Sequence, residues 1–145
     1  MPHLTLPLGA LGPTLDVLVG VSQPRASALV AAGQPVPPSV TAHVLIDTGA
    51  SCTCVDASVL AGLNLTPTGS VPINTPSTDT TPHPANQFDV SLTLMHPAIS
   101  LALGVVPVVE ICLATPGVRG LIGRDILANC IFVYDGRANL FIFGF

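Results

Sequence analysis

The residues of this sequence that could do chemistry centre on an acid that directly follows an apolar run, at residues 43–51. Burying a carboxylate costs free energy unless it is hydrogen-bonded, paired or functional, so Asp47 is the first candidate for a reactive group. Thr48 adds a hydroxyl, and Gly49 allows another part of the backbone to approach closely. A purely structural alternative also fits: the chain leaves the core through a turn, and the Asp47 side chain caps that turn.

A second segment, residues 120–127, places an apolar pair and a glycine directly before a short helical stretch. Together with the first segment, it resembles the retropepsin-like aspartic proteases, the single-domain relatives of retroviral proteases and pepsin. In that family an apolar-apolar-Asp-Thr/Ser-Gly-Ala segment carries the catalytic carboxylate, and a later apolar-apolar-Gly followed by Arg packs beneath it. The matching residues here are Leu45-Ile46-Asp47-Thr48-Gly49-Ala50 and Leu121-Ile122-Gly123-Arg124-Asp125.

The resemblance implies an all-β fold, with one domain over residues 1–145 forming a closed β-barrel of the retropepsin-like type, one short C-terminal helix and a dimeric state. Residues 3–6 look like the family's N-terminal interface strand, and residues 66–94 occupy the place of its flap hairpin, with the flap itself at residues 73–87. The implied site residues are Asp47 as the catalytic residue; Thr48 and Gly49 as support for the catalytic pair; Ala50, Ser51, Ile73, Ser77, Thr78, Asp79, Thr80, Leu121 and Ile122 as substrate-binding residues; and Gly123, Arg124 and Asp125 as structural residues.

The family's reaction needs two carboxylates, and the chain contains one Asp-Thr-Gly triplet. The resemblance therefore implies a homodimer with its active site on the two-fold axis. The two carboxyl groups share one proton: one Asp47 deprotonates a water that attacks the carbonyl of a peptide or protein substrate, and the other protonates the carbonyl oxygen. No cofactor, metal or covalent intermediate is required. The alternative is a catalytically silent module that keeps the barrel and the dimer for peptide binding or assembly.

Three features depart from the family pattern. Retroviral relatives carry an acid four places after the catalytic Asp, paired with the helix Arg; Ser51 stands there, so we expect Arg124 to use Asp125 or a backbone carbonyl. The flap region has no Gly between residues 69 and 104, and its prolines stiffen the arm. Residues 24–38 look like an insertion before the catalytic strand, and no role for them is evident.

Short strands dominate the hydropathy pattern, as expected of a barrel or sandwich of about nine strands. One or two helical turns fit residues 25–33, a short helix fits residues 55–63, and one reliable helix follows Gly123 at residues 124–129. We expect the dimer interface to contain apolar residues near the chain ends, together with the hairpin at residues 131–143. These residues are Leu4, Leu6, Phe141 and Phe143. The expected strands are residues 3–8, 14–21, 39–46, 88–94, 99–103, 105–113, 130–134 and 139–143.

The composition excludes several classes of protein. The 145 residues are 49% hydrophobic and only 8% charged, which rules out a disordered tail, and 13 Gly and 15 Pro argue against a helical bundle. A net charge of −4 argues against nucleic acid as a partner. Residues 91–109 lack charges but contain Pro97 and Pro107, so we expect no membrane-spanning helix. The N-terminus shows no signal peptide, which points to a cytoplasmic location.

The other candidate ligands and nucleophiles have simpler interpretations. The cysteines at positions 52, 54, 112 and 130 lack the Cys-x-x-Cys pattern of a zinc ribbon, so we expect free thiols, with disulfides as the alternative and no metal site. His43 lies four residues before Asp47, and we expect it to be structural. Ser51 and Ser58 lack a Ser-His-Asp arrangement in the sequence, which argues against a serine hydrolase.

Overall fold

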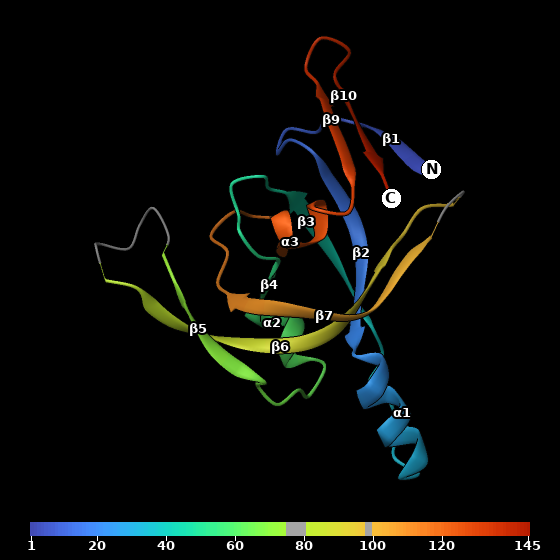
Figure 1. The fold of residues 1–145 in the computed structure, drawn as a ribbon, viewed down its shortest axis with the longest axis vertical. Coiled ribbons are helices and arrows are strands. Elements are labelled where there is room, and N and C mark those ends of the chain that lie inside the picture. The colour runs from blue at the N-terminus through green and yellow to red at the C-terminus, as the bar shows by residue number, and fades with distance from the viewer. Residues whose placement is uncertain (75–80, 98–99) are drawn as a thin grey trace.

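The computed structural model describes residues 1–74, 81–97 and 100–145, which form ten strands and three helices (Figure 1). Six strands close into a barrel, a seventh extends it, and three others form a separate small sheet. The strands are β1 (His3–Pro7), β2 (Thr14–Val21), β3 (Val40–Ile46), β4 (Cys54–Asp56), β5 (Gly69–Ile73), β6 (His83–Leu94), β7 (Leu101–Ile111), β8 (Gly120–Ile122), β9 (Ile131–Asp135) and β10 (Leu140–Gly144). The helices are α1 (Gln23–Ala31), α2 (Ala57–Ala61) and α3 (Arg124–Leu127).

The barrel runs in the order β2-β3-β8-β4-β7-β6 and closes where β6 pairs with β2. The pairs β3–β8 and β4–β7 are parallel, and the other neighbours in the ring are antiparallel. Closure follows from alternation, because every second side chain of a strand points into the barrel. On β2 and β6 these buried residues are Leu15, Val17, Val19, Val21, Phe88, Val90, Leu92 and Leu94. The predicted closed β-barrel is confirmed.

β1, β10 and β9 form the small sheet, which carries both chain ends (upper part of Figure 1). Phe141 is 0% and Phe143 1% exposed, and both belong to the core cluster of their own chain. The prediction that these two rings lie in a dimer interface is therefore wrong, since the chain's own core already covers them. The large apolar side chains that β9 leaves exposed are Ile131, Val133 and Tyr134.

The described residues contain three helices, and each overlaps a stretch in which the sequence allowed one: residues 25–33, 55–63 and 124–129. α1 occupies most of the insertion at residues 24–38 and extends beyond the lower end of β2 (Figure 1). Pro24 stands in the first turn of α1, where its fixed φ and missing N–H favour the start of a helix. α2 begins after Asp56, whose carboxylate accepts the Ser58 N–H at 3.0 Å. With nine residues in α1, no described helix has the length and hydropathy needed to cross a membrane.

Two strands differ from the prediction in length. β7 runs without a break from Leu101 to Ile111 and keeps Gly104 inside it, although the sequence predicts strands at 99–103 and 105–113; residue 99 lies outside the described residues. β6 begins at His83, earlier than predicted, and pairs with β5 to form the arm on the left of Figure 1. This arm stands where the resemblance places a flap hairpin.

Candidate active site

Asp47 lies in the tight turn that follows β3, and its backbone is fixed on both sides. Its N–H donates to the Ile122 carbonyl at 3.0 Å, and its carbonyl accepts the Ala50 N–H at 3.2 Å. One carboxylate oxygen, Oδ1, accepts the Gly49 N–H at 2.8 Å. The other oxygen has no hydrogen-bond partner in the described part of the chain. The turn therefore orients the carboxylate and leaves one oxygen available to a ligand.

Arg124 ties this turn to α3. Its N–H donates to the Ala50 carbonyl at 3.0 Å, and its guanidinium Nη1 donates to the Thr48 carbonyl at 3.2 Å. Of the two partners expected for Arg124, the structure shows the backbone carbonyl and not Asp125. Because the two bonds reach both sides of Gly49, they fix the loop that holds the candidate carboxylate.

Beneath the turn, Asp125 binds a residue that the sequence analysis missed. Thr53 is 1% exposed, and its N–H and hydroxyl donate to the two oxygens of the Asp125 carboxylate at 2.9 and 2.7 Å. The Thr53 hydroxyl oxygen also accepts the Gly123 N–H at 3.1 Å. This network joins the segment before β4 to the start of α3 across 72 residues of sequence. No local sequence pattern indicates such a long-range pairing.

Gly123 allows the two segments to pack this closely. A Cβ at this position would collide with the carbonyl group of Cys52 and lie 2.9 Å from the Thr53 nitrogen. These are backbone atoms, which cannot rotate away as the end of a side chain can. The position therefore requires glycine for reasons of space, although its φ of −90° suits any residue.

A groove of about 760 Å³ opens beside the Asp47 turn, a size typical of ligand sites. The predicted residues that line it are Asp47, Gly49, Ala50, Ser51, Ile73, Leu121 and Asp125. Two further lining residues, Asn74 and Gln87, belong to the predicted flap range. The lining residues with no prediction from the sequence are Cys52, Cys54, Val71, Pro72, Pro107, Val109 and Ile111. The alternation of Pro107, Val109 and Ile111 along β7 is the signal that could have indicated one shared face.

The structure does not bring every predicted site residue to the groove. Ile122 is 3% exposed and points into the barrel core, because alternation along β8 turns it away from the Leu121 side. Thr48 and Arg124 are exposed at the turn but do not line the groove. The predicted flap residues Ser77, Thr78, Asp79 and Thr80 lie outside the described residues.

All four cysteines are free thiols, as the sequence predicted. Burial raises the pKa of the Cys54 thiol to about 12, and the neighbouring Cys52 thiol and the carboxylates of Asp125 and Asp47 act in the same direction. The Cys54 thiol is thus within electrostatic range of the candidate carboxylate. In the described part of the chain, no group of three or more His, Cys, Asp or Glu side chains could hold a metal ion.

His43 interacts with an acid other than Asp47. Its Nδ1 lies 2.7 Å from Asp16 Oδ1, across the antiparallel pair of β3 and β2. Both side chains are about half exposed and neither lines the Asp47 groove. His43 therefore supplies no general base to the candidate site.

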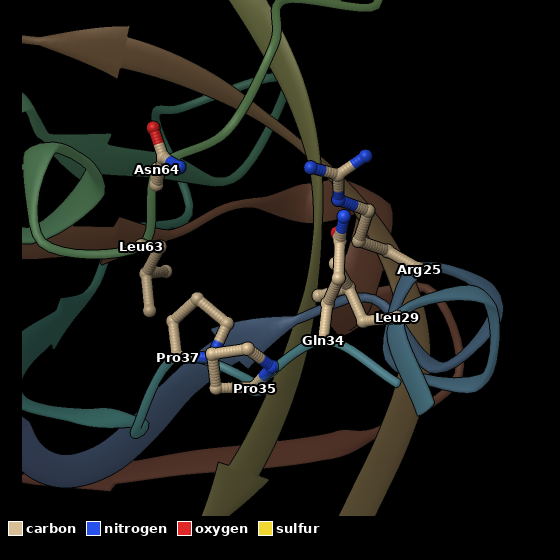
Figure 2. A pocket seen from close by; sticks show the side chains of 7 residues that line it. All are labelled: Arg25, Leu29, Gln34, Pro35, Pro37, Leu63 and Asn64. Atoms are coloured by element: carbon tan, nitrogen blue, oxygen red, sulfur yellow. The ribbon is translucent and has the colours of Figure 1, made fainter. Parts of the chain in front are cut away.

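A second depression, of about 370 Å³, lies against α1 and shares no lining residue with the Asp47 groove (Figure 2). Arg25 and Gln34 stand on one rim and Asn64 on the opposite rim, with Pro35 and Pro37 between them. Its lining includes no carboxylate, imidazole or thiol. It therefore lacks the groups that acid–base hydrolysis needs.

Comparison with known proteins identifies the fold. No family model matches the sequence, and no curated protein matches it. Among solved structures, the chain is similar to a retropepsin-like aspartic protease from Rickettsia conorii, with 13% sequence identity, 99% of this chain and 91% of that chain covered, and a TM-score of 0.58. It is also similar to the EIAV protease in complex with the inhibitor HBY-793, with 15% identity, 81% of this chain and 86% of that chain covered, and a TM-score of 0.43. With its closed six-stranded barrel, the chain has the retropepsin-like fold.

Proposed function

We propose that the chain is an aspartic endopeptidase that hydrolyses peptide bonds with a water molecule activated by two Asp47 carboxyl groups across a homodimer. The observation that carries the proposal is the Asp47 turn: a carboxylate with one oxygen fixed by Gly49 lines a groove of about 760 Å³ on a retropepsin-like barrel. A purely structural role, in which Asp47 caps the turn, explains the position of its Oδ1 oxygen. It explains neither the second carboxylate oxygen nor the groove beside the turn.

In the proposed reaction, one Asp47 is ionised and the partner subunit's Asp47 is protonated. The ionised carboxylate takes a proton from water, and the water oxygen attacks the peptide carbonyl carbon. The protonated carboxyl group donates its proton to the carbonyl oxygen, which limits the charge on the tetrahedral intermediate. When the intermediate collapses, the C–N bond breaks and the amine leaves with the proton that the first carboxyl group took from water. The Gly49 N–H supports this sequence by holding each carboxylate in one orientation.

The lining of the groove supports a substrate with apolar side chains beside the scissile bond. β5, β7 and β8 present Val71, Ile73, Val109, Ile111 and Leu121 to the groove. Burying a side chain of the size of Leu or Phe contributes about 1.5–3 kcal/mol. Peptides with such residues therefore gain binding energy here that polar peptides do not.

A second copy of the chain is needed because, among the described residues that line each groove, one carboxyl group is free to react. Asp125 also lines the groove, but its oxygens accept bonds from Thr53 and from the Ile126 N–H, so it is a poor substitute for a second Asp47. Gly49, next to the candidate carboxylate, is exposed, which leaves the turn open to contact with the same turn of a partner.

The test is cleavage of a mixed peptide library, read by mass spectrometry, at about pH 4 to 7, a range that includes the pH at which the second carboxyl group of such a pair ionises. The proposal expects cleavage by the unmodified chain, loss of cleavage in Asp47→Asn, and unchanged cleavage in Asp89→Asn. Asp89 is the matched control, because it is a partly exposed carboxylate on β6 outside the groove. With both variants shown to be folded by circular dichroism, cleavage that survives in Asp47→Asn would contradict the proposal.

A catalytically silent peptide-binding module is the second candidate. The Gly49–Asp47 bond favours it, because this bond gives the carboxylate a structural role in its own turn. In that case the unmodified chain and Asp47→Asn would bind the same library peptides with similar affinity, and neither would cleave them.

A further inference from the structure

Two thiols lie next to each other on the surface of the Asp47 groove. Cys52 and Cys54 both line it, while Thr53 between them points the other way, toward Asp125 and Gly123. This is the alternation of an extended chain, which puts residues two apart on one face. The two thiols are therefore neighbours within the groove.

The spacing allows a bond between them. A disulfide needs Cα atoms about 4.4–6.8 Å apart, and two fully extended residues span about 7 Å. Forming the bond therefore requires the two Cα atoms to approach each other slightly, by a small shift of the backbone. The Cys54 thiol already donates to the Cys52 carbonyl at 3.5 Å, and the two side chains interact with each other.

We propose that Cys52 and Cys54 form an oxidative modification site, at which a peroxide joins them by a disulfide inside the groove. Cys52 is the attacking residue, because it is the more exposed of the two. Its thiolate attacks one peroxide oxygen, the O–O bond breaks, hydroxide leaves, and Cys52 becomes a sulfenic acid. The Cys54 thiol then gives its proton to the sulfenic oxygen while its sulfur attacks the Cys52 sulfur, so that the S–S bond forms, the S–O bond breaks and water leaves. Overall, two thiols are oxidised to one disulfide and one peroxide is reduced to two waters.

The order of attack agrees with the surroundings of Cys54. Burial raises the pKa of this thiol to about 12, so it stays protonated at neutral pH. A protonated thiol is a poor nucleophile toward peroxide. Once Cys52 has been oxidised to a sulfenic acid, the Cys54 sulfur lies next to a more reactive sulfur, since the two side chains are adjacent.

The disulfide would act on the Asp47 turn through the backbone. The Cys52 carbonyl packs directly against Gly123, with no space for even a methyl group between them. The next residue, Arg124, holds Thr48 and Ala50 on the two sides of Gly49. A shift of Cys52 therefore reaches the loop that orients the carboxylate. If the proposed function holds, we further expect oxidation to lower peptide turnover by at least about tenfold. This expectation rests on the proposed function alone.

The experiment treats the full chain with hydrogen peroxide and follows its intact mass and its peptide map. We expect the loss of two hydrogens and a link between Cys52 and Cys54, both reversed by dithiothreitol. Cys52→Ser and Cys54→Ser should each lose the link. Cys112→Ser should keep it, because that exposed thiol lies outside the groove.

The mass measurement decides the site without reference to activity. Oxidation that stops at the sulfinic acid of Cys52, or that links either residue to Cys112 or Cys130, would overturn the proposal. Peptide turnover of each variant, compared with its own reduced form, then tests the effect on function. An unchanged rate of peptide cleavage in fully linked protein would overturn the coupling to the Asp47 turn. A reduced chain that cleaves no peptide would contradict the proposed function. In that case the mass measurement alone would still test the disulfide site.

Discussion

Replacing Gly123 by Ala would test how tightly α3 packs against the segment beneath the candidate site. Gly123 is buried and has an ordinary extended backbone, with φ −90° and ψ −178°, so Ala meets no conformational restriction there. The new Cβ would collide with the Cys52 carbonyl group and lie 2.9 Å from the Thr53 nitrogen. The Thr53 nitrogen is held by its bond to Asp125, so the backbone cannot move away without breaking the network.

Because this backbone is rigid, we expect Gly123→Ala to lower the free energy of unfolding. Overpacking a well-packed core costs about 1–3 kcal/mol, and a clash with fixed backbone belongs at the upper end, at about 3 kcal/mol of the free energy of unfolding. For a chain of this length, such a loss lowers the Tm by roughly 10 °C. The same displacement would move Arg124 and the Asp47 turn, so peptide turnover should fall as well.

The assay is urea or thermal denaturation followed by circular dichroism, at one protein concentration for all variants. Gly69→Ala is the matched control, because a Cβ at Gly69 has no heavy atom within 4 Å. It should change the free energy of unfolding by less than about 0.5 kcal/mol. If Gly123→Ala were as stable as Gly69→Ala, the described packing between Cys52 and Gly123 would be refuted.

Other substitutions in the network and the groove have distinct expected effects. Asp125→Ala should lower the free energy of unfolding by about 2–3 kcal/mol, because the buried Thr53 loses both of its acceptors; Asp125→Asn, which keeps one carbonyl oxygen, should lose less in the same urea titration. Arg124→Met should cost below about 1 kcal/mol, because the lost bond to Thr48 is exposed, yet steady-state kinetics should show a clear fall in peptide turnover. Cys54→Ala should flatten the alkaline fall in stability. The folded chain holds the Cys54 proton up to about pH 12 and the unfolded chain only up to 9.0, so this contribution is complete below pH 9.0. Above that pH it is lost at about 1.4 kcal/mol per pH unit, which denaturation of both proteins at about pH 8 and pH 10 would measure.

The strands and the Asp47 segment could be predicted because their signals are local. β2 occupies residues 14–21 as predicted, since the alternation of apolar residues there fits one buried face. Asp47 falls in a turn because the apolar run before it favours burial and the carboxylate does not. The Arg124 partner could be narrowed to two candidates, and the structure shows the backbone one.

What the sequence could not predict depends on pairing between distant residues. Thr53 and Asp125 meet only because β4 and β8 are neighbours in the barrel. Phe141 and Phe143 show the same apolar pattern whether a partner or their own core covers them, and the pairing of β10 with β1 decides the outcome. A proline such as Pro24 can either end a helix or strand or stand in the first turn of a helix, and the structure shows it in the first turn of α1.

In the proposed function, each active site contains two Asp47 residues, one from each chain. The most direct test mixes equal amounts of the unmodified chain and Asp47→Asn, allows subunits to exchange, and measures the initial rate of peptide cleavage at constant total protein. Random exchange leaves two carboxyl groups in about one quarter of the dimers, so the expected rate is about one quarter of that of the unmodified protein. A rate of about one half, as expected when each chain acts by itself, would contradict the shared active site.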